Sequence, residues 1–173
     1  METWIEYKRP FTGNIFSIKS GSVRLRDGQT APRDVVEHSG GAAVVAIVDD
    51  CVLFVRQFRI AIGRYLLELP AGKLEGKEDP VQRARIELEE ETGYRAGKME
   101  QIAHFYTSPG FTDEALWVYQ ATELQKTAQN LEFDEDIELL FIPVDEVRER
   151  LYAGEFEDAK TLIGLLTVFG GAV

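Results

Sequence analysis

The segment from Gly72 to Tyr94 constrains the fold more than any other part of the chain, because it predicts a glycine-bounded loop followed by a short acidic helix. Asp79 is suited to the N-cap of that helix and Pro80 to its first helical position. Gly93 is suited to the position that ends it, since glycine adopts a left-handed backbone at little cost. The sequence therefore predicts a helix with two well-defined ends.

The apolar and acidic residues of this helix fall on different faces. Val81, Ala84 and Leu88 share one face at helical spacing and are expected to dock into a core. Glu87 and Glu91 are four residues apart, so their carboxylates share a neighbouring face. Like charges at this spacing destabilise an isolated helix, and divalent cations would remove the repulsion because Mg²⁺ prefers hard oxygen ligands. The helix is therefore a candidate metal site.

The same segment resembles the Nudix box, a motif of one loop and one helix. Its pattern is Gly, five residues, Glu, seven residues, Arg-Glu, an apolar residue, any residue, Glu-Glu, any residue, Gly and an apolar residue. The residues that match in register are Gly72, Glu78, Glu87, Leu88, Glu90, Glu91, Gly93 and Tyr94. A match of this length rarely arises by chance, whereas a Glu-rich helix without it is usually an amphipathic helix with a solvated acidic face.

One position departs from the pattern, because Ile86 stands where the family carries arginine. In the family that arginine pairs with acidic residues of the motif and orients them, so the departure bears on the geometry of Glu78 and Glu90. Arg83 and Arg85 lie on the same helix and are partial substitutes, although neither is expected to point in the same direction.

The resemblance implies an α/β (α+β) fold, the Nudix-type α/β/α sandwich with a mixed central sheet. The length of 173 residues suits one domain with a modest extension. We expect residues 1–40 to form an N-terminal antiparallel β-sheet extension and residues 41–173 to form the Nudix hydrolase domain. The extension is too small to bury its own core, so it would pack on the main domain or on a second subunit.

Alternation and turn residues predict the remaining elements. The expected strands cover residues 15–18, 23–25, 35–38, 42–48, 52–58, 65–69, 99–106, 116–122 and 137–142, and the expected helices cover residues 143–153 and 158–169.

The resemblance also implies the metal site. Glu87 and Glu91 would be the main ligands of Mg²⁺ or Mn²⁺, with Glu90 assisting and a backbone carbonyl from Ala71 just before the box. Metals of this kind polarise phosphoryl oxygens, neutralise charge and activate a water molecule. The implied reaction is therefore hydrolysis of a diphosphate.

The catalytic base is expected in the acidic loop at residues 131–138, which matches the region that supplies it in related proteins. Glu135 is the first candidate, followed by Asp134 and Glu132, with Glu90 of the box as a further catalytic residue. Loop acids can swing toward a water on substrate binding. The alternative interpretation for most of these acids is a solvated loop.

Beyond the box, the chain resembles the ADP-ribose pyrophosphatase branch of the family. The matching segments are residues 12–16, 55–59, 68–72 and 108–114, and Pro109 lies fifteen residues after the box, where this branch carries a proline. The resemblance implies that ADP-ribose is cleaved to AMP and ribose 5-phosphate. Hydrolysis of other nucleoside diphosphate sugars remains an alternative, as does a catalytically weakened nucleotide-binding domain, which only Ile86 supports.

This branch binds its substrate across a homodimer whose N-terminal strands are exchanged. Carried over by position, Phe16 or Ile15 would lie against adenine, and the partner subunit's Arg33 would join Arg59 at phosphates or ribose. The other implied substrate residues are Glu68, Pro109, Gly110 and Glu114. The simpler interpretations are a core residue for Phe16 and ordinary strand-edge charges for the two arginines.

The net charge and the cysteine content limit the classes of binding partner and the cellular compartment that we expect. The net charge of −11 argues against nucleic acid or an anionic membrane as a partner, since both require a basic face. Cys51 is the single cysteine, which fits a reducing compartment, and the first residues lack the pattern of a signal peptide. We therefore expect a cytoplasmic enzyme that acts on a small-molecule nucleoside diphosphate.

Overall fold

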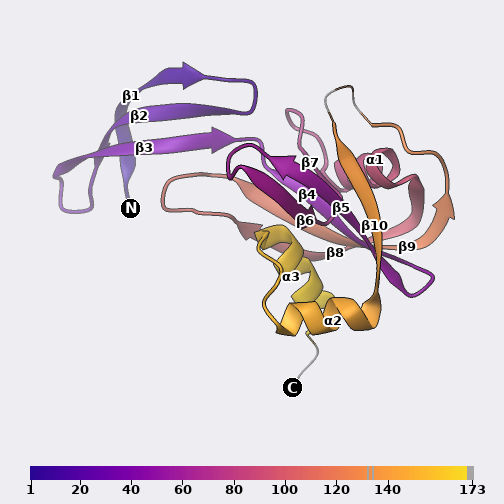
Figure 1. Cartoon of the computed structure of the whole chain (residues 1–173). Coiled ribbons are helices and arrows are strands. Elements are labelled where there is room, and N and C mark those ends of the chain that lie inside the picture. Colours follow the sequence, from indigo (N-terminus) through magenta and orange to yellow (C-terminus); the bar gives the residue numbers. More distant parts are fainter. Residues whose placement is uncertain (132, 134, 171–173) are drawn as a thin grey trace. The chain divides into compact units, whose positions relative to one another are not determined.

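The computed structural model describes residues 1–131, 133 and 135–170, which form two units (Figure 1). The first unit comprises Met1–Gly40 and Tyr106–Ala115, and the second comprises Gly41–Phe105 and the residues from Leu116 onward.

The first unit is built on an antiparallel sheet of three strands in the order β1-β2-β3. The strands are β1 (Thr3–Thr12), β2 (Phe16–Arg24) and β3 (Thr30–His38). Gly28 has a φ of 87° in the turn between β2 and β3, where its N–H donates to the Leu25 carbonyl at 3.1 Å. The segment at 106–115 attaches to β3, because the Val36 N–H donates to the Phe111 carbonyl at 2.8 Å.

This sheet exposes much of its apolar surface. Among the described residues of the unit, Val23 and Ala115 are the buried hydrophobic ones. Large apolar side chains that stay exposed are Ile5, Tyr7, Phe11, Ile15, Phe16, Tyr106 and Phe111. A sheet of this size does not bury a core of its own, as the sequence led us to expect.

The second unit is built on a mixed sheet with the strand order β10-β5-β4-β9-β8, in which β6 pairs with β5 and β7 with β4. Strand β4 runs parallel to β9 and antiparallel to β5 and β7. The strands are β4 (Gly41–Val48), β5 (Cys51–Arg59), β6 (Arg64–Glu68), β7 (Ala71–Lys73), β8 (Tyr94–Tyr106), β9 (Ala115–Lys126) and β10 (Ile137–Pro143).

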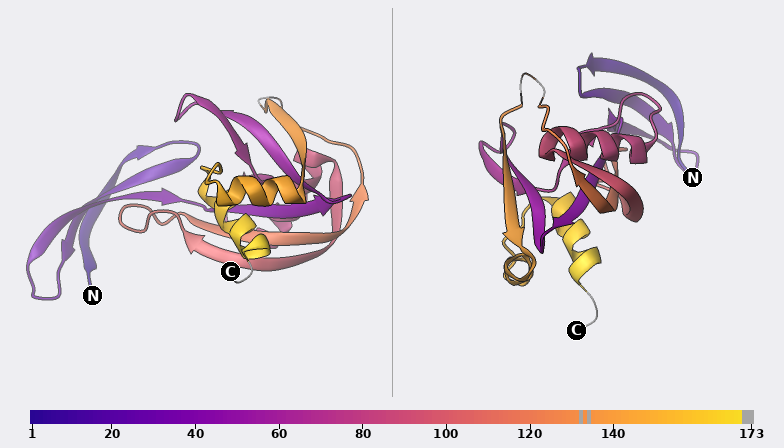
Figure 2. Two further views of the ribbon diagram at one scale, coloured as in Figure 1. Left: turned by 60° about the horizontal axis from the view of Figure 1, so that its bottom comes forward. Right: turned by 90° about the vertical axis from the view of Figure 1, so that its right-hand side faces the viewer.

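Helices cover both faces of the mixed sheet (Figures 1 and 2). They are α1 (Pro80–Thr92), α2 (Val144–Tyr152) and α3 (Ala159–Phe169). Residues of β4 alternate between two cores, because Ala43 and Val45 pack with the residues of α2 and α3 while Val44 packs with those of α1. The predicted α/β/α sandwich with a mixed central sheet is therefore confirmed.

The element boundaries differ from the sequence prediction in a few places. Strand β1 was not predicted, because its exposed, charged residues lack strict alternation and include Pro10, which an edge strand tolerates. The three-residue strand β7 is too short to leave a pattern. Strand β8 begins earlier than predicted, and strand β9 ends later than predicted.

No helix in the described part of the chain combines the length and apolar character needed to cross a bilayer.

Candidate metal and substrate site

Helix α1 begins and ends at the predicted residues. The Asp79 side chain accepts the Val81 N–H at 3.2 Å, with Pro80 in the first turn. Gly93 has a φ of 72°, and its N–H donates to the Glu89 carbonyl at 2.8 Å. Between these ends, Ala84 and Leu88 pack into the core against the sheet, and Glu87 lies beside β7.

Strand β7 passes so close to α1 that only glycine fits at residue 72. A Cβ added to Gly72 would lie 1.7 Å from Oε1 of Glu87. One residue earlier, the Ala71 N–H donates to Oε2 of Glu91 at 2.9 Å. Strand β7 therefore lies directly beside Glu87 and holds Glu91 by a hydrogen bond.

Three carboxylates meet at this point. Glu87, Glu91 and Glu135 each offer an oxygen, and these oxygens lie within 4.8 Å of one another. Glu91 is only 3% exposed. Burial, reinforced by the charge of Glu87, raises the pKa of Glu91 to about 8. Burial, reinforced by the charges of Glu135 and Glu90, raises the pKa of Glu87 to about 7.

This donor set fits a divalent cation. Three hard carboxylate oxygens suit Mg²⁺ or Mn²⁺, and a bound cation would offset both the burial and the mutual repulsion of the carboxylates. Glu87, Glu91 and Glu135 are therefore the residues that would hold the metal. Glu90 lies outside this set among the described residues, although its charge raises the pKa of Glu87.

The expected base candidates separate in the structure. Glu135 joins the two helix carboxylates, while Glu132 and Asp134 lie outside the described residues. The segment before Glu135 is fastened to the end of α1, because the Asn130 N–H donates to the Glu90 carbonyl at 2.9 Å. A second bond runs from the Gln129 side chain to the Glu91 carbonyl at 2.7 Å.

Of the two arginines expected as partial substitutes for the one that Ile86 replaces, Arg83 contacts the box acids. Its guanidinium donates to Glu78 at 2.9 Å and to Glu87 at 3.4 Å, and its side chain is 12% exposed. Arg85 instead donates to the Ala96 carbonyl at 2.7 Å. Ile86 is 40% exposed. The arginine one turn before Glu87 therefore carries the contacts to the acids of the box.

The Arg59 side chain lines the same hollow as the three carboxylates. Arg59 donates to both oxygens of Glu68, at 2.6 and 2.9 Å, and Glu68 is 2% exposed. Lys160 also donates to Glu68, and it pairs with Asp158 at 3.1 Å. The acidic hollow, of about 300 Å³, is lined by Gln57, Arg59, Ala71, Gly72, Lys73, Glu75, Arg83, Glu87, Glu91 and Glu135. Sequence reasoning identified Arg59 and Glu68 but missed Lys160 and Asp158, which no motif marks.

The other expected substrate residues belong to the first unit. The Phe11 and Phe16 rings lie 5.4 Å apart, and Ile15 is exposed. Arg33 forms an exposed ion pair with Glu2 at 2.6 Å.

Glu114 accepts a hydrogen bond from the Thr107 hydroxyl at 2.7 Å and lies 3.5 Å from His38. Pro109 and Gly110 are exposed in a turn, where the Phe111 N–H donates to the Ser108 carbonyl at 3.0 Å.

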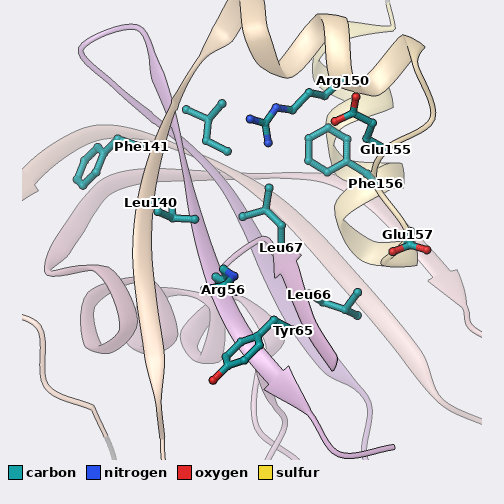
Figure 3. A pocket seen from close by; sticks show the side chains of 11 residues that line it. Arg56, Tyr65, Leu66, Leu67, Leu140, Phe141, Arg150, Glu155, Phe156 and Glu157 are labelled. Carbon is teal, nitrogen blue, oxygen red and sulfur yellow. The ribbon is translucent and has the colours of Figure 1, made fainter. Parts of the chain in front are cut away.

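A second hollow in the mixed-sheet unit, of about 450 Å³, lies between β5, β6, β10 and α2 (Figure 3). Its floor is apolar, with Leu67 and Leu140, and the Arg56 guanidinium lies 4.4 Å from the centre of the Tyr65 ring. No group of three metal-ligating side chains from the described residues lines it. The acidic hollow is therefore the better candidate site, although it is the smaller one.

The fold and the acidic hollow define an α/β/α protein with an acidic helix that is suited to a divalent cation, and comparison with known proteins gives its family. The profile of the NUDIX domain matches residues 38–163. The chain is 39% identical to the ADP-ribose pyrophosphatase of Bacillus subtilis (strain 168), over 92% of this chain and 88% of that protein. The chain belongs to the NUDIX family.

Two further comparisons agree with this assignment. The chain is 38% identical to the methanol dehydrogenase activator of Bacillus methanolicus, over 95% of this chain and 90% of that protein. A crystal structure of an ADP compounds hydrolase superposes with a TM-score of 0.83 at 19% identity, over 96% of this chain and 91% of that one, which supports the fold. The expected family, fold and enzyme class are thus confirmed.

Proposed function

We propose that this protein hydrolyses the diphosphate of ADP-ribose to AMP and ribose 5-phosphate, with a divalent cation held by Glu87, Glu91 and Glu135. The observation that carries the proposal is the convergence of these three carboxylates in the hollow that Arg59 also lines. The similarity to the B. subtilis pyrophosphatase supports ADP-ribose as the substrate. We favour Mg²⁺ as the cation, with Mn²⁺ as the alternative, because both take oxygen ligands.

Each residue of the hollow has a stated task in this proposal, and Glu135 has two, because one of its carboxylate oxygens would bind the cation while the other would act as the base. A bound divalent cation would neutralise phosphate charge and lower the pKa of a water molecule. Arg59 presents a planar fork that can donate two bonds to phosphate oxygens, and its 41% exposed side chain is accessible. Glu135 is the proposed base, and its carboxylate takes a proton from the water that attacks one phosphorus atom. The bond to the bridging oxygen then breaks, and the two monophosphates leave.

We further propose a cytoplasmic homodimer with exchanged N-terminal strands. The exposed apolar residues of the three-stranded sheet support a second subunit as its cover, since burying them would stabilise an association. In this arrangement Phe16 stacks on adenine, and the partner subunit's Arg33 binds phosphate or ribose. Glu114, Pro109 and Gly110 complete the substrate site. The single cysteine supports a reducing compartment.

The direct test is incubation with ADP-ribose and Mg²⁺ or Mn²⁺, with AMP measured as the product. Glu91→Gln keeps the shape of the side chain but removes its charge, and we expect it to lower kcat at least about 100-fold. EDTA should abolish turnover of the wild-type protein. Full activity of Glu91→Gln would refute the site assignment.

Two alternatives are separated by the same assay. Comparable kcat/KM values for ADP-ribose, ADP-glucose and GDP-mannose would favour a broader nucleoside diphosphate sugar hydrolase. Binding of ADP-ribose in calorimetry without any product would favour a weakened nucleotide-binding domain. The contacts of Arg83 with Glu78 and Glu87 argue against the second alternative, because they restore ion pairs to the box acids despite Ile86.

A further inference from the structure

The first turn of α3 is fastened to the segment that precedes the box. Asp158 caps the helix by accepting the Thr161 N–H at 3.0 Å and the Thr161 hydroxyl at 2.6 Å. The same hydroxyl accepts the Leu69 N–H at 2.9 Å, and Thr161 is fully buried. Two residues after Leu69, the Ala71 N–H holds Glu91. Hydrogen bonds thus connect α3 to a carboxylate of the metal site.

A set of four charges accompanies these bonds. Arg59 and Lys160 both donate to Glu68, and Lys160 also pairs with Asp158, so two cations balance two anions. The side chain of Glu68 is 2% exposed and that of Lys160 is 12% exposed. Burying charge is costly even when the charges are paired, and an apolar cluster of similar volume would be about as stable. The arrangement therefore calls for a reason other than stability.

The reason is found at Arg59, which is the most exposed of these four charged residues. Arg59 lines the acidic hollow with Glu87, Glu91 and Glu135, while Lys160 does not line it. Both bonds that the structure gives to the Arg59 guanidinium go to Glu68. Glu68 in turn is held from behind by Lys160. The direction of Arg59 over the hollow is therefore determined by a carboxylate whose own position depends on α3.

We propose that Lys160 and Asp158 are positioning residues, which fix Glu68 and thereby aim the Arg59 guanidinium at the diphosphate. This assignment rests on the proposed function for the identity of the ligand. In this assignment Glu68 holds Arg59 and does not itself contact the substrate. The assignment also gives α3 a functional task that no motif in the sequence marks.

The test is a double-mutant cycle between Lys160→Met and Arg59→Met, assayed with ADP-ribose and Mn²⁺. Lys160→Met should raise KM about tenfold and change kcat less than about threefold, because it loosens a substrate-binding arginine. In the Arg59→Met background the same substitution should add nothing further, since the two residues act as one unit. Independent, additive effects on KM would overturn the proposal.

Two further variants control for stability. Asp158→Asn keeps a side chain that can cap α3 but removes the charge that Lys160 pairs with, so it should raise KM in the same direction even if Lys160→Met folds poorly. Glu157→Gln removes a neighbouring acid whose exposed pair with Arg64 lies outside the set of four, and it should leave KM unchanged. Equal effects of Asp158→Asn and Glu157→Gln would contradict the proposal.

A crystal structure of the metal-free Lys160→Met protein distinguishes failure of this inference from failure of the proposed function. The inference predicts that the Glu68 carboxylate shifts and that the Arg59 guanidinium shifts with it, whatever the substrate proves to be. Unchanged positions of the Glu68 carboxylate and the Arg59 guanidinium would overturn the inference even if ADP-ribose is the substrate. Absence of AMP from the wild-type protein would instead refute the proposed function.

Discussion

Glu91 is nearly inaccessible to solvent and yet has two other carboxylates beside it. Burial and the neighbouring charge of Glu87 favour the protonated form of Glu91 in the metal-free protein, which raises its pKa to about 8. The same argument applies to Glu87, with a pKa of about 7. Under the proposed function, the site would exchange protons for a cation when the metal binds.

The first prediction concerns the stability of the metal-free protein against pH. Between the ordinary carboxyl pKa of roughly 4.3 and the raised values, the folded protein binds more protons than the unfolded chain. Its free energy of unfolding should therefore fall as the pH rises from about 5 to about 8. Denaturant titrations of the metal-free protein at several pH values would measure this.

The matched control is Glu91→Gln, which cannot ionise and should flatten the pH dependence. Saturating Mn²⁺ should flatten it in the wild-type protein as well, because the cation takes the place of the protons. A metal-free wild type that gains stability over this pH range would contradict the assignment of these two buried carboxylates.

The second prediction concerns Arg83, which joins Glu78 to Glu87. Arg83→Met should lower kcat roughly 10- to 100-fold, the range usual for groups that orient metal ligands. Arg85→Met is the control, because it removes an arginine from the same helix. The Arg85 side chain donates to the Ala96 carbonyl and not to the box acids. Equal losses in both variants would show that the helix as a whole, and not the ion pairs of Arg83, was affected.

At this scale the sequence indicated the candidate metal ligands better than the residues that support them. Helical spacing puts Glu87 and Glu91 on one face, and the resemblance to the Nudix box implied their role as ligands. The contacts of Arg83 and Lys160 follow from neither, because the partner of a long flexible side chain depends on which elements lie beside it in the fold. Sequence reasoning named Arg83 and Arg85 as partial substitutes and could not separate them for this reason.

At the scale of elements, the contact between β7 and α1 brings the site together. The prediction here is that Gly72→Ala abolishes Mn²⁺ binding, because its Cβ would lie 1.7 Å from Oε1 of Glu87 and must displace that carboxylate. Gly76→Ala is the control on the same loop. It strains a backbone with a φ of 60° but meets no atom within 4 Å, so it should cost stability and leave Mn²⁺ affinity unchanged.

Calorimetric titration with Mn²⁺ alone would check both variants. Wild-type affinity in Gly72→Ala would mean that Glu87 is not a ligand, or that the loop moves away freely.

Sequence reasoning was most accurate for elements that begin and end at capping residues. Asp79, Pro80 and Gly93 determine α1 locally, so its bounds were predicted correctly. Strand β7 depends on pairing with β4, which is distant in the sequence, and β1 depends on pairing with β2. Pairing between strands leaves no mark on a short or irregular segment, and these two strands were therefore missed.

At the scale of the whole molecule, the exchanged dimer makes a prediction about mixed subunits. If the partner subunit's Arg33 completes each site, then Arg33→Ala and Glu91→Gln subunits should restore activity to each other. A mixed dimer would have one site with both residues intact and one with both altered. Each variant alone should be impaired, and a mixture refolded together should recover up to about a quarter of wild-type activity by random pairing.

Two outcomes would count against this arrangement. A mixture no more active than its components would place Arg33 in the same subunit as its site or outside the site altogether. A mass of one chain, about 19.5 kDa, in light scattering would rule out the dimer itself.

The central claim is that Glu87, Glu91 and Glu135 gather cations at which water cleaves a diphosphate. Anomalous diffraction from crystals soaked in Mn²⁺, grown from protein with proven ADP-ribose turnover, tests it most directly. The account predicts anomalous density beside these three carboxylates. Active enzyme whose crystals show manganese elsewhere, with none at this cluster, would contradict it.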